Sequence, residues 1–128
     1  MTTPYRLDMR SFGKELQVTI TGDERAYENV VACWLQIAAE VKARGATRLL
    51  AVSHVKGEPM QAERMTGFFA GMEGLGLEGV RVAYVDMAGF KTPLMETAEI
   101  LASEHGFSAR IFDNLIAAEL WLRHGDRP

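Results

Sequence analysis

The sequence has little of what marks several common classes of protein. Its single cysteine, Cys33, has no second cysteine with which to form a disulfide within the 128 residues. A chain without paired cysteines is typical of a reducing compartment. The first residues, MTTPYRLDMR, lack the apolar core of a signal peptide, and no stretch approaches the roughly 18 consecutive apolar residues of a membrane span. We therefore expect a cytoplasmic protein without stable membrane insertion.

An excess of charge of one sign is also missing. The chain has 14 lysine and arginine residues against 17 aspartate and glutamate residues, which gives a formal net charge of −3. Proteins that bind nucleic acid usually present a basic face or stripe, so this balance argues against a nucleic-acid partner. No run of like charges forms an acidic or basic tail.

The sequence lacks a recognisable catalytic motif. Ser53 and His54 stand together after an apolar run, which raises the question of a nucleophile and its base. Neighbouring residues on a strand point to opposite faces, so His54 is badly placed to activate Ser53. The flanking residues do not form the G-x-S-x-G turn that exposes a nucleophilic serine. We therefore expect no enzyme activity; a deep polar cleft that brings His54 close to Asp86 or Lys91 would instead favour an enzyme.

Cofactor and metal motifs are missing in the same way. The run GLGLEG at 74–79 has the glycine spacing of a dinucleotide-binding turn, but it precedes a strand, whereas that turn follows one. The three histidines are far apart, and none lies at ligand spacing from another histidine or from the cysteine. Cys33 lies within a predicted helix that packs, which is typical of a buried, unreactive thiol. We predict no cofactor and no metal site.

Hydrophobic periodicity divides the chain into nine elements. Apolar and polar residues alternate on both sides of a turn at 11–14, which predicts an antiparallel hairpin. The later segments change between the three- and four-residue spacing of helices and the apolar runs of buried strands. The elements predicted after the hairpin are a helix between its cap Asp23 and Gly45, a strand Arg48–Ser53, a helix begun by Glu58 and Pro59, a strand Val80–Met87, a helix from Thr92-Pro93 to Gly106, a strand Ser108–Phe112 and a helix capped by Asp113 or Asn114.

The order of these elements is β-β-α-β-α-β-α-β-α. An opening hairpin followed by repeated βα units predicts an α/β fold with a mixed, mostly parallel sheet of five strands and four helices. No internal repeat, linker or low-complexity segment interrupts this order. We therefore expect a single domain over residues 1–128.

The second predicted helix has an unusual composition. Methionine adapts to irregular apolar partners, and each glycine inside a helix costs about 1 kcal/mol relative to alanine. In one interpretation, a helix that contains Gly67 and Gly71 lifts from the sheet and admits a hydrophobic ligand. In the other, its apolar face is ordinary core, and the two glycines allow close packing against a neighbour. The predicted buried stripe contains Ala62, Met65, Phe68, Phe69 and Met72.

The last third of the chain resembles a known family. It contains VRVAYVD at 80–86, then an amphipathic helix, then ARIFDNLIAAELWL at 109–122. With the element order over nearly the whole chain, these segments resemble the STAS-type domain. They are most similar to the SpoIIAA-like group of anti-sigma-factor antagonists, which shares features with Sec14-type lipid-binding domains. The resemblance implies a SpoIIAA-like fold and a non-catalytic regulatory module that binds proteins through the second helix.

One feature of the antagonists is missing from this chain. Those that switch partners by phosphorylation carry an Asp-Ser-Ser-Gly-like motif leading into the second helix. The corresponding segment here, VKGEPM at 55–60, has no hydroxyl group, and the nearest hydroxyls belong to Ser53 and Thr66. The resemblance therefore implies partner binding without the phosphorylatable serine.

Polar residues follow two adjacent strands of the predicted sheet. In open parallel sheets ligands bind at the carboxyl ends of the strands, where helix N-termini present free N–H groups. Two lysines beside two helix starts would hold a carboxylate or a phosphate group there. Alternatively, this rim is solvated and Thr92 only caps its helix. The residues at this edge are Ser53, His54 and Lys56 after one strand and Asp86, Lys91 and Thr92 after the next.

These observations give two hypotheses for function. The first is a regulatory module that contacts an unidentified protein, or itself as a homodimer, through the second helix and the loop before it. The alternative is a carrier of a small hydrophobic or acidic-headed ligand between the second helix and the sheet. A pocket beneath Met65, Phe69 and Met72 would favour the carrier, whereas a fully packed helix with a flat exposed apolar patch would favour the partner module. The predicted partner or ligand surface contains Ser53, His54, Lys56, Glu58, Met60, Met65, Phe69, Met72, Lys91 and Thr92.

Overall fold

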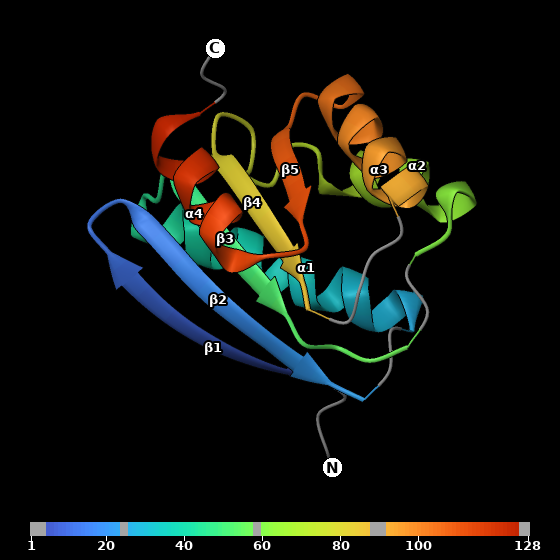
Figure 1. Ribbon diagram of the computed structural model, residues 1–128, viewed down its shortest axis with the longest axis horizontal. Coiled ribbons are helices and arrows are strands. Elements are labelled where there is room, and N and C mark those ends of the chain that lie inside the picture. The colour runs from blue at the N-terminus through green and yellow to red at the C-terminus, as the bar shows by residue number, and fades with distance from the viewer. Residues whose placement is uncertain (1–4, 24–25, 58–59, 88–91, 126–128) are drawn as a thin grey trace.

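The computed structural model describes residues 5–23, 26–57, 60–87 and 92–125 (Figure 1). These residues form a five-stranded sheet and four helices in the predicted order, which confirms the predicted α/β class. The elements are β1 Tyr5–Phe12, β2 Glu15–Gly22, α1 Tyr27–Arg44, β3 Arg48–Ser53, α2 Ala62–Met72, β4 Arg81–Asp86, α3 Thr92–Glu104, β5 Ser108–Phe112 and α4 Leu115–His124.

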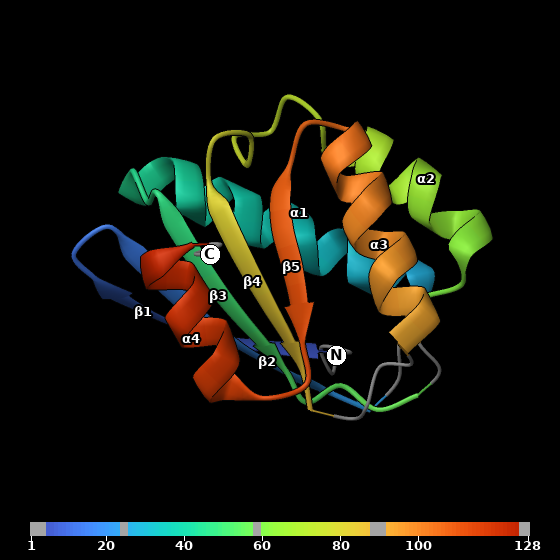
Figure 2. The same cartoon turned by 45° about the horizontal axis from the view of Figure 1, so that its top comes forward.

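The strands lie side by side in sequence order, from β1 to β5. β1 pairs antiparallel with β2, and the other three pairings are parallel. Crossover connections between parallel strands keep one hand, so helices that join successive strands fall on the same face of the sheet. Accordingly α1, α2 and α3 lie on one face, and α4 returns to the other face over β3 and β4 (Figures 1 and 2).

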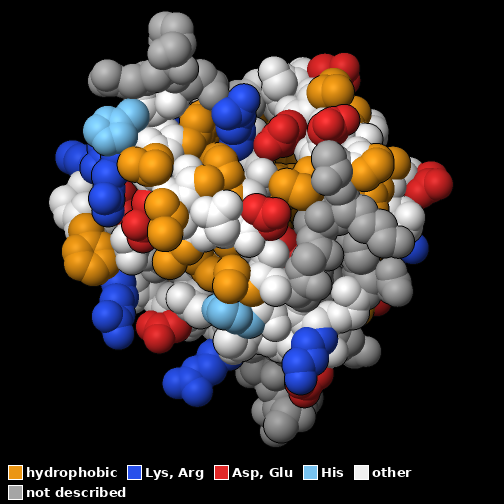
Figure 3. Space-filling view, in the orientation of Figure 1, with side chains coloured by type: hydrophobic (Ala, Val, Ile, Leu, Met, Phe, Trp, Pro, Cys, Tyr) orange, Lys and Arg blue, Asp and Glu red, His pale blue; other side chains and the backbone are white. Residues whose placement is uncertain are grey.

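Each face of the sheet has its own core. On the α1 face, Ile37 and Val41 of α1 pack with Leu49 of β3, and the cluster extends to α2 and α3. On the α4 face, Trp121 and Leu122 are buried in a smaller cluster with residues of β3 and β4. The strand β3 is therefore covered on both sides, as its apolar run predicts. On the outer side of α4, hydrophobic residues stay exposed (Figure 3): Leu115, Ile116 and Leu120.

The hairpin is longer than predicted. β1 and β2 pair over eight consecutive positions, from Tyr5 with Gly22 to Phe12 with Glu15, and the turn contains only Gly13 and Lys14. Ser11 and Phe12 are exposed, so the hydrophobic pattern gave no sign that they continue the strand. Gly13 has a φ of 59°, in the left-handed region that glycine adopts without strain.

Two predicted helix starts need correction. Asp23 is not the cap of α1, because this helix begins at Tyr27 and its N-cap residue, Ala26, makes no side-chain cap. The second helix begins at Ala62, not at Glu58 and Pro59, which lie outside the described residues. Ala62 is exposed instead of buried, because it stands in the first turn, where α2 has not yet reached the core.

Three other predicted helix ends are confirmed. Asn114 caps α4, and its side-chain oxygen accepts a hydrogen bond from the backbone N–H of Ala117 at 2.8 Å. Gly45 ends α1 with a φ of 63°, and Gly106 follows α3 with a φ of 88°. Among the residues described, no helix combines the length and hydropathy that crossing a membrane requires.

Candidate functional site

The predicted surface residues separate into two groups in space, and the first group lies at the carboxyl end of β3. Ser53 is only 1% exposed, and its hydroxyl oxygen accepts a hydrogen bond from the Val55 backbone N–H at 3.3 Å. His54 and Lys56 are exposed, and their backbone N–H groups donate to Ile20 at 2.8 Å and Gly22 at 3.3 Å. The segment therefore continues the pairing with β2 before the chain leaves the sheet.

Ser53 and His54 face opposite environments, as expected for neighbours on a strand. Asp86 lies opposite Ser53 in the register of β3 and β4, and it is also 1% exposed. The edge thus places buried Ser53 and Asp86 together and leaves the His54 side chain in solvent. Glu58 and Lys91 lie outside the described residues, and Thr92 is described only as the first residue of α3.

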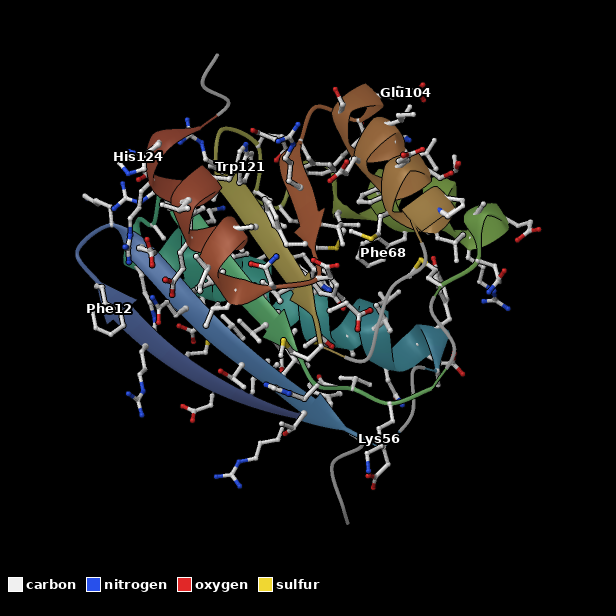
Figure 4. The ribbon with its side chains drawn as sticks, in the orientation of Figure 1. Phe12, Lys56, Phe68, Glu104, Trp121 and His124 are labelled. Atoms are coloured by element: carbon white, nitrogen blue, oxygen red, sulfur yellow. The ribbon has the colours of Figure 1, made fainter. Side chains whose placement is uncertain are left out.

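The second group lines one apolar cavity of about 150 Å³. Met60, Met65, Phe69 and Met72 meet there, between α2, α3 and the sheet. Phe68 lies in the same layer, between the helices and the strands (Figure 4). This is the pocket that was expected to favour a small ligand, beneath Met65, Phe69 and Met72.

Aromatic rings make up much of the cavity wall. Trp34 of α1 and Tyr84 of β4 pack with their ring centroids 6.0 Å apart. Phe69 contacts Phe68 edge to face at 5.3 Å and lies 6.2 Å from Phe107. Methionine side chains adapt to irregular apolar surroundings, and the wall of this cavity is almost entirely apolar.

Among the described residues that line the cavity, Glu99 alone carries a charge. Its carboxylate oxygen Oε2 accepts a hydrogen bond from the backbone N–H of Ile111 at 2.8 Å. This bond holds α3 against the edge strand β5, where Ile111 also lines the cavity. The site therefore offers dispersion contacts and one negative charge, and it contains no arrangement of nucleophile and base.

α2 covers the cavity, and near its start the Arg64 guanidinium lies 4.7 Å from the centroid of the Tyr27 ring. Only Met65 and Met72 of this helix are buried, and its N-cap residue Gln61 makes no side-chain cap. At its carboxyl end, His105 Nδ1 lies 3.5 Å from Glu73 Oε1, and the Glu78 carboxylate accepts a hydrogen bond from the Gly74 N–H at 2.7 Å. That bond, with other backbone hydrogen bonds, lowers the pKa of Glu78.

The surroundings of the two glycines of α2 do not support the close-packing interpretation. A Cβ atom at Gly71 would meet nothing within 4 Å, and one at Gly67 would lie 3.8 Å from the Tyr27 hydroxyl. Close approach of a neighbour therefore does not require either glycine. What they do is lower the intrinsic helical stability of the segment, by about 1 kcal/mol each relative to alanine.

Several cavity residues were missing from the predicted surface. Trp34, Tyr84 and Phe107 line the cavity, but none of them belongs to the predicted partner or ligand surface. Alternation along β4 places Tyr84 on the α1 face with Val82. This pattern predicts the face of the sheet on which a side chain lies, but it does not predict a cavity there. Whether apolar groups meet or leave space depends on how the helices pack, and periodicity does not encode this.

The thiol of Cys33 is buried in the core of the α1 face. Burial raises the pKa of the Cys33 thiol to about 12, so the thiolate that would act as nucleophile is not formed near neutral pH. Within the described part of the chain, no three histidine, cysteine, aspartate or glutamate side chains are grouped to hold a metal ion.

Comparison with known proteins identifies the fold. No protein-family model matches the chain, and no curated protein matches it. The chain is similar to a solved structure of an uncharacterized protein from the DUF3478 family with a SpoIIAA-like fold, from Shewanella loihica PV-4. The two are 12% identical, the match covers 92% of this chain and 93% of that chain, and the TM-score is 0.55. The predicted SpoIIAA-like fold is thereby confirmed; at this identity the likeness concerns the fold alone.

Proposed function

We propose that this chain is a non-catalytic regulatory module that binds another molecule through α2 and the loop before it. The observation that carries this proposal is the position of α2 over an apolar cavity. A helix that leaves unfilled space beneath it loses packing energy, and its two glycines lower its stability further. Elements that move on binding belong to such weakly held parts of a structure.

A protein partner is the first candidate. The exposed side of α2 carries small and charged residues, including Glu63, Arg64 and Ala70, and the exposed Lys56 precedes it in the loop. These small and charged residues do not form the flat apolar patch that the partner hypothesis called for, so this candidate depends on the family resemblance. The resemblance to partner-binding STAS domains points to the same element.

Site-directed photo-crosslinking tests this candidate. A photoreactive side chain replaces Ala70 on α2, and the matched control replaces Ala43, which is also exposed and lies on α1. In extracts of the source cells we expect a discrete crosslinked protein from position 70 and none from position 43. Equal crosslinking from both positions, or none from position 70, would contradict the assignment of α2 as the contact element.

The cavity favours a second candidate, a small apolar ligand held beneath α2. A cavity of about 150 Å³ is comparable to an engineered apolar cavity that binds benzene. The negative charge of Glu99 at its wall opposes an acidic head group. This candidate is therefore a carrier or sensor of a compact neutral molecule, which narrows the expected class of ligand.

A further inference from the structure

The free edge of the sheet at β1 is unusual. β1 pairs with β2 on one side, and among the described residues no strand pairs with its other side. Natural proteins usually protect such an edge by making it short, by placing charged side chains or a proline in it or by inserting a bulge, and of these β1 has only charged side chains, which alternate in sign. β1 has eight residues, no proline and eight consecutive pairs without a bulge, whereas the opposite edge strand, β5, has only five residues.

The strand is also held in place at both ends by α1. The Tyr5 hydroxyl donates to Gln36 Oε1 at 3.2 Å, and Arg44 Nη1 donates to Ser11 Oγ at 2.9 Å. A strand fixed in this way presents an ordered row of backbone groups. Because each unpaired N–H and C=O is a ready partner for another strand, the β1 edge is a template for β-strand addition.

The two faces of β1 carry complementary patterns. Tyr5, Leu7 and Met9 are half-buried against the core of the α1 face. The other face carries exposed side chains of alternating charge, and basic and acidic groups lie in turn along the β1 margin of the molecule (Figure 3): Arg6, Asp8 and Arg10. An added strand must match apolar groups on one face and charges on the other.

A second copy of β1 meets both conditions in one register. A two-fold symmetric parallel pair would turn the α1 faces of the two copies to opposite sides of the sheet, so the apolar face of one β1 would adjoin the charged face of the other. An antiparallel pair centred on Asp8 also fails, because Asp8 would face Asp8 and Arg6 would face Arg10. Centred on Met9, the pair would set Leu7 against Ser11, whose hydroxyl is already bound by Arg44.

The register centred on Leu7 leaves no mismatch over residues 5–9. Leu7 faces Leu7 of the second copy, and Tyr5 faces Met9, so the α1 face is apolar throughout. Arg6 of each copy faces Asp8 of the other copy, so the pair contains two such contacts between opposite charges. We propose that two copies of this chain join antiparallel through β1 in this register and form one continuous ten-stranded sheet.

Cysteine crosslinking tests the register. In a Cys33→Ala background, Leu7→Cys places two thiols directly opposite each other, and we expect a disulfide-linked dimer under mild oxidation. The matched variant Met9→Cys, on the same face, places its two thiols about 13 Å apart and stays uncrosslinked. Crosslinking of Met9→Cys in preference to Leu7→Cys would overturn the proposed register.

Charge reversal tests the interface itself by analytical ultracentrifugation. We expect the unmodified chain to be a dimer, and Asp8→Arg, which lines β1 with three cations, to weaken it about tenfold or more. The double variant Arg6→Asp with Asp8→Arg restores opposite charges and should restore the dimer. Both residues are exposed, so circular dichroism and thermal unfolding should show an intact fold. A monomeric unmodified chain, or a dimer that Asp8→Arg leaves unchanged, would overturn the proposal.

Discussion

At the scale of single residues, Glu99 limits what the cavity accepts. Its carboxylate is engaged with the Ile111 N–H, so it is fixed in place at the wall. A ligand with its own carboxylate would bring two negative charges together in a region of low dielectric, which is costly. The hypothesis of an acidic-headed ligand therefore becomes less favourable than that of a neutral one.

Cys33 makes a second residue-scale prediction, about pH. Burial raises the pKa of the thiol from 9.0 to about 12, so its contribution to stability is complete below about pH 9. Above that pH the unfolded chain loses a proton that the folded chain keeps, and the free energy of unfolding falls as the pH rises toward 12. Between about pH 8 and pH 10 we expect the loss attributable to Cys33 to be about 1 kcal/mol.

Urea unfolding of the unmodified protein and of Cys33→Ala measures this loss. The variant has no thiol to titrate, so its stability should fall less than that of the unmodified protein over the same pH interval. Parallel losses in the two proteins would show that the folded thiol ionises as readily as an exposed one.

At the scale of elements, the account depends on α2 and the space beneath it. The Met and Phe residues at helical spacing predicted that this helix turns an apolar face inward, and Met65 and Met72 are indeed buried. The sequence pattern left open whether that face is ordinary core or the roof of a pocket. In the structure Met65, Phe69 and Met72 all line a cavity, which is the geometry that the pocket interpretation requires, while Met65 and Met72 are also buried.

Filling the cavity from α3 tests whether it is a binding site. Ala98 lines the cavity, and Ala98→Leu should occupy part of it and raise the free energy of unfolding by about 1 kcal/mol. The matched variant Ala38→Leu changes an alanine in the packed core on the same face and should cost about 1–3 kcal/mol.

Binding of a probe completes this test. By calorimetry we expect the unmodified protein to bind indole, a compact neutral molecule, and to bind benzoate much more weakly because of Glu99. Ala98→Leu should bind neither. If Ala98→Leu were as destabilising as Ala38→Leu, or bound indole unchanged, the space beneath α2 would not be a usable pocket.

Much of the framework could be predicted from the sequence. Alternation and helical spacing gave all nine elements, and Asn114, Gly45 and Gly106 marked helix ends because caps and left-handed residues have local causes. Asp23 failed as a cap because α1 begins further along the chain, after Ala26, whose apolar side chain gives no capping signal. Glu99 could not be recognised at all, because its partner Ile111 lies on another element.

At the scale of the whole molecule, the two faces and the two edges of the sheet differ in what covers them. The α1 face holds the core and the cavity, the α4 face is closed by one helix, and β1 presents the long free edge. In the proposed dimer the two cavities lie at opposite ends of the continuous sheet. Each cavity lies toward β5, whereas the dimer contact is at β1, the other edge of that copy's sheet. Each copy would then bind its ligand or partner independently of the dimer contact.

Native mass spectrometry of the protein, purified from its source cells without denaturation, tests the central claim most directly. The account predicts masses that exceed those of the 14.2 kDa chain or its dimer by a retained small molecule or a bound protein. The Ala98→Leu variant should lose a retained small molecule, and Ala70→Arg on the exposed side of α2 should lose a bound protein. Only bare chain and bare dimer, at every concentration, would contradict the claim that α2 and its cavity form a binding site.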